Sequence, residues 1–147
     1  MRNVLLLTLV LMVTASLAVA QSGRIAIFNT PTPDPPGSDD ACAITDAAPG
    51  LLSIYVVQTG TGGATACQFS APIPSCLGVG ATWLSDTAVW PVTVGDSQVG
   101  VGIGYGTCQA GDVHVLTVNL FAQGNTPACC VWEVLEDPRE EPPVLVY

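Results

Sequence analysis

The chain has 147 residues and a net charge of −9, with three basic residues against 12 acidic ones, and 49% of its residues are hydrophobic. So acidic a chain repels phosphate, which argues against binding to nucleic acid or to an anionic membrane. The hydrophobic fraction is too high for a polypeptide that stays unfolded, so we expect a folded acidic protein.

The first 20 residues have the features of a secretory signal peptide. Arg2 supplies the positive charge, Val4–Val13 is an apolar core, and Ala18–Ala20 has the small-x-small form of a cleavage site. The alternative, a membrane anchor, is disfavoured because the core is shorter than the roughly 20 residues of a spanning helix. We expect cleavage before Gln21 and one secreted or periplasmic domain, residues 21–147. Loss of Arg2 changes the net charge from −9 to −10.

Short apolar or alternating segments, separated by glycine and proline, follow one another through this domain. They are typical of strands, and no segment beyond the signal peptide has helical periodicity. Leu51–Thr59 and Ala64–Ala71 flank Gly60–Gly63 and are candidates for a hairpin. Pro91 restricts its segment to an edge or a bulge. The other predicted strands are Arg24–Asn29, Ala81–Ser85, Ala88–Val94, Ser97–Tyr105, Asp112–Phe121, Cys130–Leu135 and, at an edge, Val144–Tyr147.

About seven to nine short strands predict an antiparallel β-sandwich, with a barrel as the alternative. The segment Asp112–Phe121 (DVHVLTVNLF) is predicted to be its central strand. Strict alternation would place Val113 and Val115 with Thr117 and Asn119 on one face. The opposite face would then hold His114, Leu116, Val118 and Leu120.

Six cysteines follow the signal peptide, and an even number in an exported protein predicts three disulfides. Cys129 and Cys130 are neighbours, and a bridge between them would be strained, so pairings that contain it are disfavoured; the others stay open. Zinc binding is disfavoured because the chain has one histidine and no C-x-x-C pair. The six positions are Cys42, Cys67, Cys76, Cys108, Cys129 and Cys130.

Glycines recur at every second residue in the segment Gly100–Gly106 (GVGIGYG). This is strand spacing, and no helix or acidic partner follows as in a nucleotide-binding loop. Gly100, Gly102 and Gly104 should therefore share one bare face, opposite Val101, Ile103 and Tyr105. We expect a bulky neighbour to cover this face, with Trp83, Trp90 and Trp132 as candidates. The alternative is a shallow binding groove for a sugar ring or an extended peptide.

The candidate catalytic residues form no recognisable motif. His114 is the only histidine, and Asp112 lies two residues before it, so Asp112 is a candidate to orient the imidazole in a hydrolase. No G-x-S-x-G motif accompanies this pair. A carboxylate pair for glycoside hydrolysis is conceivable among Asp86, Asp96 and Glu133.

Two further groups of residues are candidate ligand sites. Asp34, Asp39 and Asp40, with Asp46, crowd one proline-rich region and are weak candidates for calcium, although solvated turn residues are the default interpretation. The three tryptophans and Tyr55 are candidates for a carbohydrate platform, with core packing as the default.

The segment Leu51–Pro74 (LLSIYVVQTGTGGATACQFSAPIP), followed later by HVLTVNLF, resembles the layout of bacterial secreted cohesin-like and related immunoglobulin-like domains. The chain is also similar to small secreted bacterial proteins that end in a vicinal cysteine pair. The resemblance implies a sandwich fold and no functional residues. Because the sequence has no catalytic motif, no cofactor motif and no basic patch, we expect a secreted binding or structural module for a protein or glycan, without a cofactor, and keep a small secreted hydrolase as the alternative.

Overall fold

The structure is a computed structural model that describes residues 23–33, 46–77, 81–127 and 130–139. Every regular element in these ranges is a β-strand, which confirms the all-β prediction. The predicted signal peptide and the predicted strand Val144–Tyr147 lie outside the described residues. The strands are β1 (Arg24–Phe28), β2 (Pro49–Phe69), β3 (Thr82–Ala88), β4 (Val92–Asp96) and β5 (Gly100–Gln123).

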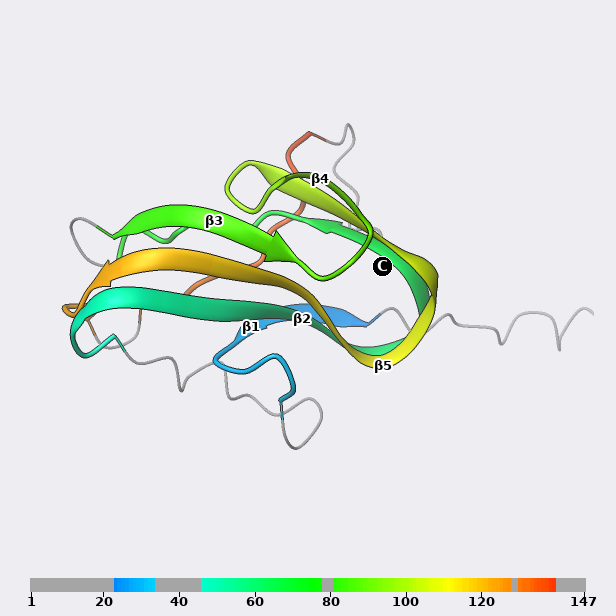
Figure 1. The fold of residues 1–147 in the computed structure, drawn as a ribbon, viewed down its shortest axis with the longest axis horizontal. Coiled ribbons are helices and arrows are strands. Elements are labelled where there is room, and N and C mark those ends of the chain that lie inside the picture. The colour runs from blue at the N-terminus through cyan, green and yellow to red at the C-terminus, as the bar shows by residue number, and fades with distance from the viewer. Residues whose placement is uncertain (1–22, 34–45, 78–80, 128–129, 140–147) are drawn as a thin grey trace, which may run out of the picture.

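The five strands form one antiparallel sheet in the order β1-β2-β5-β3, and β4 pairs with the other end of β5 (Figure 1). The frame of the sheet is the pair β2 and β5, which have 21 and 24 residues. Strands of ordinary domains have about 5–6 residues. Across the ranges that the structure describes, no helix has the length and apolarity needed to cross a membrane.

The sheet bends sharply where glycine-rich parts of β2 and β5 lie side by side. Gly60 and Gly63 in β2, and Gly106 and Gly111 in β5, have positive φ angles, a conformation that glycine adopts at low cost. The register between the strands shifts three times from Gln58 to Ala66, as at β-bulges. The sheet therefore turns back on itself, as Figure 1 shows.

This bend corrects two predictions about the strands. Leu51–Thr59 and Ala64–Ala71 do not form a hairpin: residues up to Phe69 continue as one strand through the bend, and each part pairs with β5. The segments Ser97–Tyr105 and Asp112–Phe121 are likewise joined within β5. Two pairs of predicted strands are therefore each one strand in the described residues, because the glycines bend the strands without ending them.

We call the two halves of the bent sheet the first arm and the second arm. The first arm holds β1, β3, residues 49–58 of β2 and residues 113–123 of β5. The second arm holds β4, residues 64–69 of β2 and residues 100–105 of β5. One hydrophobic core joins side chains of both arms, among them Ile54 and Leu116 from the first and Phe69 and Ile103 from the second.

A bulge in β5 changes which side chains of the predicted central strand face the core. Val56 pairs with Leu116 while Val57 pairs with His114, so Val115 is an extra residue without a partner on β2. Beyond the bulge the alternation changes phase, and Val113 lies on the same buried face as Leu116. The prediction that Val113 and Val115 share a face with Thr117 and Asn119 was therefore wrong.

The segment after β5 is not the strand predicted at Cys130–Leu135. Leu135 makes only an isolated bridge to Ser70, with backbone N–H groups donated in both directions at 2.9 and 2.8 Å. A disulfide between Cys76 and Cys130 ties the start of this segment to the loop after β2. Residues 130–139 therefore run along the second arm, held by the disulfide, by the backbone pair of Ser70 and Leu135 and by side-chain hydrogen bonds.

Candidate functional site

Gly102 and Gly104 lie on the outer surface of the second arm, as their spacing predicts, whereas Gly100 is buried. Val101, Ile103 and Tyr105 point into the core, with at most 3% of each residue exposed. Gly102 pairs with Gln68 on one side and Val94 on the other, and Gly104 pairs with Ala66 and Val92. Cross-strand partners share a face of the sheet. We call this outer surface the glycine face: Ala66, Gln68, Val92, Val94, Gly102 and Gly104.

The glycine face is uncharged and mostly apolar. No atom of the described residues lies within 4 Å of the position that a side chain at Gly102 would take, and a side chain at Gly104 would have only Val92 in ordinary contact among them. Val92 and Val94 are 55% and 64% exposed. In an exposed cluster of this kind, β-branched side chains flank backbone without side chains, so a flat surface of a partner protein can come into contact with the backbone.

The tryptophans do not cover the glycines, which corrects the expectation that one of them would. All three are partly buried against the hydrophobic core. Trp90 donates its indole N–H to the carbonyl of His114 at 2.8 Å and packs on Tyr105 with ring centroids 4.9 Å apart. Trp83 donates to Asp86 and Trp132 donates to the carbonyl of Ala71. Because each ring packs on the core and donates inside the protein, they form no platform on the glycine face.

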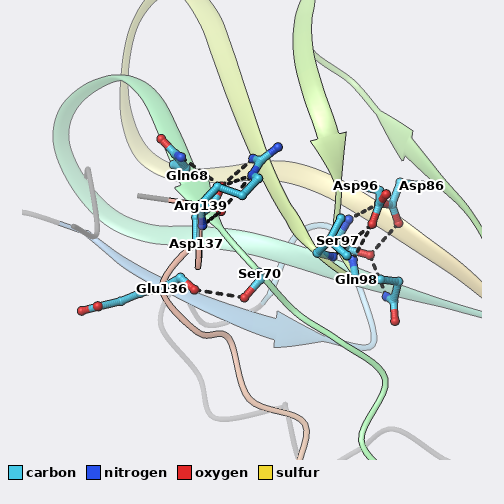
Figure 2. Close-up of polar contacts among 10 residues, drawn as sticks. Gln68, Ser70, Asp86, Asp96, Ser97, Gln98, Glu136, Asp137 and Arg139 are labelled. Carbon is cyan, nitrogen blue, oxygen red and sulfur yellow. Dashed lines mark hydrogen bonds and ion pairs between the residues drawn. The ribbon is translucent and has the colours of Figure 1, made fainter. Parts of the chain in front are cut away.

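A buried carboxylate, and not a tryptophan, covers Gly100, at the start of the glycine-rich segment of β5. Figure 2 shows Asp137 between Arg139 and Gln68, and a side chain at Gly100 would overlap with the Asp137 carboxylate. Asp137 is fully buried and accepts hydrogen bonds from the backbone N–H and Nε of Arg139, both at 2.9 Å, and from Nε2 of Gln68 at 2.9 Å. The Arg139 guanidinium, which is itself 40% exposed, also forms an ion pair with it. These bonds hold the pKa of Asp137 well below its usual range, against the opposing effect of burial.

A second polar cluster closes the turn between β4 and β5 (Figure 2). Asp86 accepts the backbone N–H of Ser97 at 2.6 Å and the Ser97 hydroxyl at 2.9 Å. Asp96 accepts the backbone N–H groups of Gln98 and Val99. These two carboxylates therefore hold backbone in place, and Glu133 is exposed elsewhere. This use of Asp86 and Asp96 does not favour a glycosidase pair.

His114 and Asp112 do not contact each other through any hydrogen bond found among the described residues. Asp112 accepts the backbone N–H of Gly60 at 2.9 Å, across the bend of the sheet. Nε2 of His114 lies 3.1 Å from the hydroxyl of Thr117, and its ring meets Tyr55 edge to face at 5.5 Å. Burial lowers the pKa of His114. The imidazole is thus part of a polar surface on the first arm.

The cysteines take three different roles. Cys76 and Cys130 form a disulfide, Cys67 is a buried thiol and Cys108 is an exposed thiol at the bend. Burial raises the pKa of Cys67 to about 11, and its neighbour Tyr105 has a raised pKa for the same reason. Among the four cysteines that the structure describes, one of the three expected bridges is present, and Cys67 and Cys108 are free thiols. Cys42 and Cys129 lie outside the described residues.

No described part of the chain shows a metal site. The calcium candidates Asp34, Asp39 and Asp40 lie outside the described residues. Their neighbour Asp46 accepts the backbone N–H of Gly124 at 2.8 Å and the hydroxyl of Thr126 at 2.7 Å, so it fixes a loop. In residues 23–33, 46–77, 81–127 and 130–139 there is no group of three or more His, Cys, Asp or Glu side chains that could hold a metal ion.

Sequence reasoning missed the two features that define this site. The burial of Asp137 carries no local signal, because Glu136–Pro143 has the composition of a solvated connector. The exposure of Val92 and Val94 follows from the pairing of β4, which among the described strands pairs with β5 alone. Pro91, expected inside an edge strand, lies between β3 and β4 instead. No protein-family model, curated protein or solved structure matches this chain.

Proposed function

We propose that this protein is a secreted binding module, built as a disulfide-tied β-sandwich, whose contact surface for a partner protein is the glycine face. The open space over Gly102, between the exposed side chains of Val92 and Val94, is the observation that carries this proposal. Burying apolar surface contributes about 25 cal/mol per Å², and a face without side chains lets a partner approach the backbone.

The sandwich part of the proposal is supported by the bent sheet, whose two arms share one core. The immunoglobulin-like and cohesin-like character of the fold also remains a proposal. Export is supported by the Cys76–Cys130 bridge, because disulfides persist in oxidising compartments. Binding is favoured over hydrolysis because Asp112 and His114 use their polar atoms on different partners.

Gly102→Val tests the contact surface. A side chain fits there without a clash, and valine favours a strand, so the melting temperature should stay equal or rise. The added branch would hold a flat partner away from the backbone. We therefore expect the variant to lose a protein that the wild type captures from the extracellular and envelope fractions of the producing organism, identified by mass spectrometry.

Gly50→Val is the matched control, because Gly50 also has no atom within 4 Å of a side-chain position but lies on the first arm. It should keep the captured protein. Equal capture by wild type and Gly102→Val would refute the glycine face as the contact surface. A sharp fall in the melting temperature of Gly102→Val would show that the face is packed inside the protein.

A further inference from the structure

The outer surface of the first arm carries a second set of side chains, in register across three strands. Asn119 of β5 pairs with Ser53 of β2 and Ser85 of β3. Thr117 pairs in the same way with Tyr55 and Thr87. Cross-strand partners share a face, so the six lie together on the side opposite the core residues Leu116, Val118 and Leu120. We call this surface the polar face: Ser53, Tyr55, Ser85, Thr87, Thr117 and Asn119.

The polar face is a hydrogen-bonded ladder centred on Asn119. The Ser53 hydroxyl donates to Oδ1 of Asn119 at 2.8 Å, and Nδ2 of Asn119 donates to the hydroxyl oxygens of Thr87 at 3.1 Å and Ser85 at 3.5 Å. Each of the two accepting hydroxyls retains its own proton, since none of the hydrogen bonds found among the described residues uses it. The ladder therefore presents fixed hydroxyl groups that can still donate to a ligand.

No side chain of the polar face is charged, although the chain has 12 acidic residues. Apolar side chains border it at one end, where Leu51 is 79% exposed and its cross-strand partner Phe121 is 38% exposed. Tyr55 and the His114 ring stand at the other end. Hydroxyl and amide groups flanked by apolar and aromatic surfaces suit a ligand whose own hydroxyls alternate with C–H faces.

We propose that the polar face binds a neutral, extended polysaccharide. Sugar hydroxyls would hydrogen-bond to the ladder around Asn119, and the apolar faces of sugar rings would pack on Tyr55 at one end and on Phe121 at the other. The lack of charged side chains on the polar face is what selects a neutral polysaccharide. The negative net charge of the protein repels an acidic polysaccharide, whereas it neither attracts nor repels a neutral one. This inference concerns the opposite arm from the glycine face and does not depend on it.

The test is isothermal titration calorimetry of the mature protein with soluble β-glucan, xylan, galactomannan and starch, and with polygalacturonate as the acidic comparison. We expect one of the neutral polymers to bind, with an affinity that hardly changes between 50 and 500 mM salt, because screening acts on charges. Asn119→Leu should weaken binding roughly five- to tenfold, as expected for the loss of hydrogen bonds to a ligand.

Thr87→Val provides a second variant if Asn119→Leu fails to fold. Thr87 is exposed and valine has nearly the same shape as threonine, so this variant removes only the hydroxyl and should weaken the same binding. Gly102→Val on the other arm should leave glycan affinity unchanged, even if it abolishes capture of a protein partner. The inference is overturned if no neutral polymer binds, if binding survives both polar-face substitutions, or if polygalacturonate binds equally well.

Discussion

The outer surfaces of the two arms differ in their side chains, although both arms are built on the same two long strands, β2 and β5. The polar face on the first arm is a ladder of side chains that hold one another across three strands. The glycine face on the second arm has almost no side chains over its centre, and a single buried carboxylate anchors the segment at its end. The first arm thus distributes its polar contacts over exposed side chains of three strands, whereas at the end of the glycine face one buried residue, Asp137, accepts from both Arg139 and Gln68.

The largest expected effect on stability comes from Asp137→Asn. The substitution weakens charge-assisted hydrogen bonds to Arg139 and Gln68 at a fully buried site, so we expect unfolding to become easier by about 2 kcal/mol. Urea denaturation followed by tryptophan fluorescence measures this change. Asn119→Ala in the exposed ladder of the first arm should cost less, about 1 kcal/mol or below.

Glu136→Gln is the matched control for Asp137→Asn, because Glu136 is the exposed neighbour, and within the described ranges its one hydrogen bond found uses the backbone carbonyl, which accepts from the Ser70 hydroxyl. Its urea midpoint should equal that of the wild type. If Asp137→Asn also leaves the midpoint unchanged, the contrast between the two arms does not hold.

Lowering the pH should gradually remove the contribution of Asp137 to the free energy of unfolding. The Asp137 pKa is depressed in the folded protein, so the unfolded chain takes up its proton first, near the ordinary aspartate pKa of about 3.9. The stabilisation is therefore complete above about pH 4 and is lost as the pH falls through the folded pKa. The difference in unfolding free energy between wild type and Asp137→Asn should shrink from pH 6 to pH 2.5. A constant difference over this range would contradict the assignment.

The last prediction concerns the reactivity of the cysteines and not stability. It is tested by labelling thiols with iodoacetamide at pH 8. Cys108 is exposed at the bend and should react in the folded protein. Cys67 is buried with a pKa of about 11, so it should react only after denaturation. Cys76 and Cys130 should react only after reduction. Peptide mapping reads all four positions, and labelling of Cys76 without reduction would contradict the bridge.

The sequence determined the elements whose cause is local. Alternation and β-branched residues predicted the all-β class, and the glycine period correctly separated Gly102 and Gly104 from Val101 and Ile103. Both follow from the period of two in a strand, which needs no knowledge of the rest of the chain. The predicted strand Ala88–Val94 was wrong: Pro91 lies between β3 and β4, in the segment that ends one strand before the next begins.

Only the tertiary structure decided where strands continue and what meets across them. Glycines at Gly60 and Gly106 are compatible with a turn or with a bend, and pairing with the neighbouring strand selects the bend. The bulge at Val115 and the burial of Asp137 depend on residues more than 50 positions away in the sequence: the bulge on Val56 and Val57, which pair on either side of it, and the burial on Gln68. Register and long-range contacts are properties of two segments together, so neither segment's own pattern contains them.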